Sequence, residues 1–128
     1  MDNISDSIQI EVNTRYLDEQ SEPAKNRYVF AYSIEITNHG AESVTLLNRH
    51  WHITDDNNKV EEVIGEGVIG QQPEIAPGRS FNYTSGAVIE TELGTMHGSY
   101  GMQTSAGEKF QAPIPAFLLS LHLSLIHI

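Results

Sequence analysis

The sequence of 128 residues contains no cysteine. This absence excludes a disulfide scaffold, Cys-ligated zinc or iron–sulfur sites and thiol catalysis, and it fits the reducing cytoplasm, where we expect the protein to lie. Long apolar runs are also missing, because none reaches the ~18 residues that a membrane span needs. Residues 1–6 have neither the basic nor the apolar region of a signal peptide. We therefore expect no membrane span and no signal peptide.

Basic residues are scarce. Seven Lys and Arg stand against seventeen Asp and Glu, which gives a formal net charge of −10. Such a chain repels phosphate backbones and anionic lipids, so we expect no nucleic-acid partner. Cations and basic protein surfaces are easier partners. The length is that of one domain, and a hydrophobic fraction of 39% excludes a wholly disordered chain.

Helical periodicity is lacking, and alternation with a period of two residues runs through the chain instead. Turn-forming residues, such as Asp55 to Asn58, separate the alternating stretches. The expected strands are residues 8–14, 28–37, 44–54, 59–64, 81–85, 95–104 and 109–117. About seven strands with such spacing predict an all-β, antiparallel β-sandwich that is immunoglobulin-like or fibronectin type III-like.

The third expected strand has two distinct faces. We expect Leu47, Trp51 and Ile53 on the core face and His50 and His52 on the other. In the last expected strand, two prolines predict a sheet edge or a bulge. They are Pro113 and Pro115.

Several motifs of the chain form a recognisable set. They are residues 49–55 (RHWHITD), the glycine loop 65–70 followed by Gln72-Pro73, Pro77-Gly78, residues 81–86 (FNYTSG), 94–100 (GTMHGSY) and 114–117 (IPAF). In order and spacing they resemble the bacterial ApaG family. The resemblance implies a fibronectin type III-like fold and a genetic link to cobalt and magnesium tolerance, often written "magnesium/cobalt efflux". The ApaG domain is also fused to F-box and polymerase-interacting proteins, which implies a protein-binding module. The resemblance implies no catalytic residues, and we expect no enzyme activity.

The resemblance sets the expected domain at residues 1–117, with its core beginning near residue 6. Residues 118–128 depart from the family as an apolar tail without charge. The last six residues, Leu-Ser-Leu-Ile-His-Ile, resemble the translation of a sequencing adapter. We expect this tail not to be native. The alternative is a further strand, because alternation continues from Leu119 to Leu125.

The glycine loop fits the pattern Gly-x-Gly-x-x-Gly, but no helical pattern follows it, which excludes a dinucleotide-binding turn. Three interpretations remain: a loop that needs positive φ angles, a backbone nest for an anion, and a partner-binding loop that presents Val68, Ile69 and Ile75. Nearby glutamates disfavour the anion. The candidates for ligand or partner contact are Gly65, Gly67, Val68, Ile69 and Gly70.

Histidines supply the candidate metal ligands. His50 and His52 are two residues apart on a strand and therefore project from one face. Such a pair can chelate a divalent cation when a third ligand is near, and His97 is the remaining candidate inside the domain. Imidazole suits cobalt, nickel or zinc. The plainer interpretation is solvated histidines beside a core tryptophan, so no cofactor is predicted and a bound cation is a hypothesis.

Two functions follow from these observations. The first is a non-enzymatic protein-interaction module whose link to cobalt and magnesium homeostasis is indirect, since a chain without a membrane span is not itself a transporter. The alternative is direct binding of a divalent metal or of a diphosphate-containing ligand. The sequence identifies no partner, and it leaves open a monomer or a homodimer paired through sheet edges.

Overall fold

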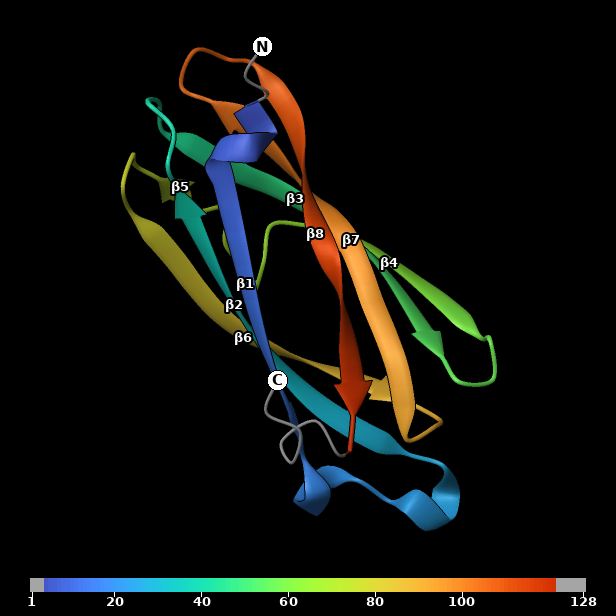
Figure 1. Cartoon of the computed structure of the whole chain (residues 1–128). Coiled ribbons are helices and arrows are strands. Elements are labelled where there is room, and N and C mark those ends of the chain that lie inside the picture. Colours follow the sequence, from blue (N-terminus) through green and yellow to red (C-terminus); the bar gives the residue numbers. More distant parts are fainter. Residues whose placement is uncertain (1–3, 122–128) are drawn as a thin grey trace.

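The computed structural model describes residues 4–121, which form strands arranged in two layers (Figure 1). The strands are β1 (Ile8–Tyr16), β2 (Tyr28–Asn38), β3 (Val44–Asp55), β4 (Val60–Glu66), β5 (Glu74–Ile75), β6 (Ser80–Ile89), β7 (Leu93–Thr104) and β8 (Lys109–Ser120). Three short 3-10 turns are added at Ile4–Ser7, Asp18–Gln20 and Pro23–Lys25. In this part of the chain no helix has the length and apolar character to cross a membrane.

The two layers are antiparallel sheets. One has the order β1-β2-β6, and the other has the order β4-β3-β7-β8, with β5 paired to β3. The predicted all-β antiparallel sandwich is therefore confirmed, and every expected strand is present. The two-residue β5 is additional, because it is too short to show alternation. That this sandwich is immunoglobulin-like or fibronectin type III-like stays a prediction.

The beginning of β3 differs from the predicted alternation. Its pairing with β7 is irregular between Leu46 and Asn48, which inserts one extra residue into the strand. An inserted residue moves the preceding side chains to the other face of the sheet. Leu46 is consequently fully buried and Leu47 only half-buried, so the prediction that Leu47 shares the core face with Trp51 is wrong.

The last strand is longer than expected. β8 continues three residues beyond Phe117, and Leu119 is fully buried opposite Gly94. Residues 122–128 lie outside the described part of the chain, and the expectation that residues 118–128 are not native stays a prediction. Pro113 and Pro115 lie in β8 at the edge of the five-stranded sheet, as predicted.

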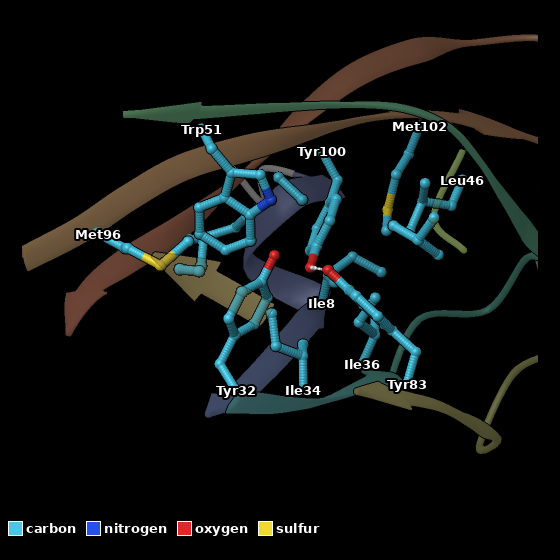
Figure 2. Packing of buried hydrophobic residues seen from close by; sticks show 14 of the residues in the cluster. Ile8, Tyr32, Ile34, Ile36, Leu46, Trp51, Tyr83, Met96, Tyr100 and Met102 are labelled. Carbon is cyan, nitrogen blue, oxygen red and sulfur yellow. Dashed lines mark hydrogen bonds between the residues drawn. The ribbon is translucent and has the colours of Figure 1, made fainter. Parts of the chain in front are cut away.

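Trp51 lies at the centre of the core between the two layers. Its side chain is 2% exposed and meets aromatic rings from three strands in edge-on arrangements, of which Tyr32 and Tyr100 are labelled in Figure 2. The ring centroids lie 5.5 Å away for Tyr32 of β2, 5.8 Å for Phe117 of β8 and 6.2 Å for Tyr100 of β7. Edge-to-face packing is favourable for aromatic pairs. Trp51 therefore joins both sheets.

A pair of tyrosines also joins the two sheets. The hydroxyl groups of Tyr83 on β6 and Tyr100 on β7 share a hydrogen bond inside the core (Figure 2). Burial raises the pKa of both hydroxyls above the ordinary tyrosine value. Both groups are therefore neutral at physiological pH, and each satisfies the other in an apolar environment.

Candidate functional site

Three histidine side chains gather on the outer face of the five-stranded sheet. His50 and His52 come from β3, where they flank the buried Trp51. His97 comes from β7, whose register places it opposite His52. The rings of His52 and His97 stack with centroids 4.9 Å apart, and those of His50 and His52 lie 4.7 Å apart. The structure thus brings together the three histidines that the sequence marked as candidates.

A carboxylate from β4 joins this group. Glu62 lies opposite His52 in the pairing of β3 with β4. Its Oε2 is 3.2 Å from Nε2 of His50 and 3.1 Å from Nε2 of His52. The interaction with His50 is the largest cause of a lowered pKa for Glu62, which stays ionised. These three residues each offer one metal-ligating atom, and the atoms lie within 4.8 Å of one another.

Glu62 was not among the candidate ligands from the sequence, although the predicted turn at residues 55–58 fixes which residues of β3 and β4 lie opposite each other. Asp55 and Lys59 close that turn, with the amide of Asp55 donating to the carbonyl of Lys59 at 3.0 Å. Oδ1 of Asp55 accepts hydrogen bonds from the amides of Asn57 and Lys59. Counting outward from this closing pair places Glu62 opposite His52. If the length of the turn were misjudged by one residue, the pairing of β4 with β3 would shift and Glu62 would be placed on the other face of the sheet.

The glycine loop is fastened to β3. The amide of Gly67 donates to the carbonyl of Leu47, at the irregular point of β3. Arg49 donates from Nη1 to the carbonyls of Glu66 and Gly67, at 3.0 Å each. Gly67 has a φ of 59°, and a Cβ there would lie 2.1 Å from the carbonyl oxygen of Gln71. Only glycine fits this position, which agrees with the interpretation of the loop as a turn that needs positive φ.

The loop presents fewer apolar side chains than expected. Val68 is fully buried and Ile75 is 2% exposed, because both belong to the core cluster. The prediction that these two side chains are available to a partner is therefore wrong. Ile69, with a φ of 44°, is 53% exposed and remains available, as does the exposed Gly70, whereas Gly65 is half-buried against the guanidinium of Arg49. The amides of Val68 and Gln71 donate to each other's carbonyls, which leaves neither free to cradle an anion.

The edge of the five-stranded sheet at β4 is the most exposed apolar feature near the loop. β4 pairs with β3 on one side and with no other strand of residues 4–121. Val60 is 58% exposed and Ile64 is 68% exposed. On the inner side of β4, a pocket opens between β4 and β6. Its lining includes Glu61, Val63, Trp51, Ser85 and Val88.

Comparison with known proteins gives consistent matches. The model of the ApaG domain family matches residues 18–104. "Protein ApaG" of Azoarcus sp. (strain BH72) is 54% identical over 114 residues, which cover 89% of this chain and 90% of the relative. "Protein ApaG" of Shewanella sediminis (strain HAW-EB3) is 51% identical over 121 residues, which cover 94% of this chain and 96% of the relative. A crystal structure described as the ApaA protein from Bordetella pertussis superposes with a TM-score of 0.87 at 46% identity. The match covers 89% of this chain and 93% of that protein.

Proposed function

This chain belongs to the ApaG domain family, and we propose that it acts as a non-enzymatic docking module that adds a strand of a partner protein to the edge of β4. The free edge of β4 carries the proposal. We further propose that the module works in the bacterial cytoplasm and that the family's link to cobalt and magnesium homeostasis runs through the partner.

The edge of β4 has the properties of a strand-docking surface. An edge strand leaves a row of backbone amides and carbonyls unpaired, and an extended peptide binds there by completing the sheet. Val60, Glu62 and Ile64 share the outer face of β4, and Glu61 and Val63 lie on the inner face. Ile69 of the glycine loop adds a third exposed apolar side chain beyond the end of the strand. Backbone pairing would supply affinity, and these side chains would supply specificity.

Charge indicates which partner fits this edge. β4 carries three exposed carboxylates, Glu61, Glu62 and Glu66, and the whole chain has a formal charge of −10. A segment that combines lysine or arginine with apolar residues would complement this surface. A second copy of β4 would instead place like charges on adjacent strands, which is unfavourable. The occupant that we propose is therefore a basic, extended segment of a different protein.

A diphosphate-containing ligand has less support. Three amides at the glycine loop, those of Gly67, Val68 and Gln71, already donate to carbonyls of the chain. Arg49 is also engaged, since its guanidinium donates to carbonyls of the loop. An anion would have to displace these contacts before it could bind. Partner docking needs no such change.

The variant Ile64→Lys tests the docking surface. A lysine in place of this 68% exposed side chain should leave the fold intact and repel a basic segment. We expect binding of the partner to weaken at least tenfold, as for an interface hot spot of about 2 kcal/mol. The measurement is quantitative capture of lysate proteins on the immobilised full chain, followed by the dissociation constant of the purified partner.

Leu93→Lys is the matched control, because Leu93 is 41% exposed and lies at the start of β7, away from β4. Partner binding should be unchanged in this variant. Equal affinity of the Ile64→Lys variant and the unmodified chain would contradict docking at β4. An equal loss in the Leu93→Lys variant would contradict it as well.

A further inference from the structure

We propose that His50, His52 and Glu62 form a binding site for one divalent transition-metal ion on the outer face of β3 and β4. The three side chains come from two neighbouring strands, and their ligating atoms converge on one point of the surface. The proposal does not rest on partner docking, because metal binding is measured on the chain alone, although Glu62 also belongs to the acidic surface that we propose for the partner.

The two distances from the carboxylate oxygen to the histidine nitrogens are close to the spacing of ligand atoms around a tetrahedral ion. Zinc holds imidazole nitrogens and carboxylate oxygens at about 2.0–2.2 Å, so neighbouring ligand atoms around a tetrahedral ion lie about 3.3–3.6 Å apart. Here Oε2 of Glu62 lies 3.2 Å from Nε2 of His50 and 3.1 Å from Nε2 of His52. The carboxylate oxygen is therefore close to its binding distance from each nitrogen, and all three ligand atoms lie within 4.8 Å of one another.

The side chains that hold these atoms are positioned by the sheet. His50 and His52 alternate with Trp51, whose burial fixes the local backbone of β3. His97 stacks on His52 with an interplanar angle of 10° and limits rotation of that ring. His97 thus has a positioning role in the proposed site. The third ligand is Glu62 rather than His97, which was the candidate from the sequence.

The donor set indicates which ions would bind. Two imidazole nitrogens with one carboxylate oxygen suit zinc, cobalt or nickel, whereas magnesium and calcium prefer sites made of oxygen alone. The side chains of His50, His52 and Glu62 are 38%, 33% and 52% exposed. A fourth coordination position would consequently face solvent and hold water, as in zinc sites with three protein ligands. The strongly negative chain would attract the cation.

Metal titration of the full chain tests this site. After treatment with a chelator, the protein is titrated with zinc chloride by calorimetry and with cobalt chloride by visible absorption. We expect one ion per chain and the intense absorption of four-coordinate cobalt(II). Glu62→Gln should weaken binding at least tenfold, since loss of even an indirect partner of a metal ligand typically costs about 10–100-fold in affinity. His52→Gln should have at least the same effect.

Control variants separate this site from other histidines. His39 follows the end of β2 in the other sheet and contacts Gln9 of β1, so His39→Gln should keep full affinity. The double change His122→Gln and His127→Gln removes the two histidines of the tail and should also keep it. Amide NMR spectra establish that each variant is folded. Absence of saturable binding, full affinity in the Glu62→Gln variant, or loss of binding in the tail variant would each overturn the proposal.

Discussion

Trp51→Ala is expected to lower the free energy of unfolding by about 3–5 kcal/mol, the usual cost of removing a large buried aromatic side chain. The indole is 2% exposed and meets rings from β2, β7 and β8. Its removal would leave a cavity between the sheets that neither layer can fill alone. A loss of this size is a large share of the ~5–15 kcal/mol that stabilises a typical domain.

Urea unfolding followed by far-ultraviolet circular dichroism measures this loss, because Trp51 is the only tryptophan and its fluorescence disappears in the variant. Trp51→Phe is the matched control. It keeps an aromatic ring and sacrifices no hydrogen bond, since the buried Nε1 has no partner among the described residues. We expect this variant to lose about 1–2 kcal/mol. A loss below about 1 kcal/mol for Trp51→Ala would contradict the central place of Trp51.

Gly98→Ala is expected to destabilise the chain by about 2–4 kcal/mol, because β3 and β7 approach too closely there for a side chain. Gly98 lies opposite Trp51 in the pairing of these strands. A Cβ at this position would be 2.0 Å from the carbonyl oxygen of His50 and 3.1 Å from Cα of Trp51. Both are backbone atoms, so relief requires the two strands to separate. The same displacement would move His50 and weaken the proposed metal site.

Gly86→Ala is the control for this prediction, because Gly86 is also a strand glycine but has room. A Cβ there would meet only the carbonyl oxygen of Phe30, at an ordinary contact distance of 3.5 Å. We expect its free energy of unfolding to change by less than about 0.5 kcal/mol. Thermal unfolding of both variants gives the comparison. Equal stability of the two would contradict the close approach of β3 and β7 at Gly98.

Much of the fold could be predicted because alternation of period two is a local property of a strand. In β2 the side chains of Phe30, Ile34 and Ile36 share the core, as their spacing predicts. The irregularity at Leu47 could not be predicted in this way. It depends on contacts from distant segments, such as the hydrogen bond from Gly67 to the carbonyl of Leu47.

The candidate site shows the same division between local and distant information. The shared face of His50 and His52 follows from their spacing on one strand. Their contact with Glu62 depends on the register of β4, and the stacking of His97 on His52 depends on the register of β7. Registers are set by turn geometry and by the whole sheet. Spacing along the chain therefore identified two of the three proposed ligands and missed the carboxylate.

The prediction that Val68 of the glycine loop is exposed to a partner was wrong for a related reason. An apolar residue between glycines can be an exposed contact or an anchor in the core, and the sequence pattern is identical in both cases. Two backbone hydrogen bonds between Val68 and Gln71 turn the loop inward. Val68 is therefore buried, whereas Ile69, the next residue, is 53% exposed.

Amide hydrogen exchange of the full chain, alone and saturated with its purified partner, tests docking at the edge of β4 most directly. Strand addition predicts slower exchange for alternate amides of β4, which face away from β3 in the free chain. Amides of β8, at the opposite edge of the same sheet, should be unchanged. Slower exchange at β8 with none at β4 would contradict the account.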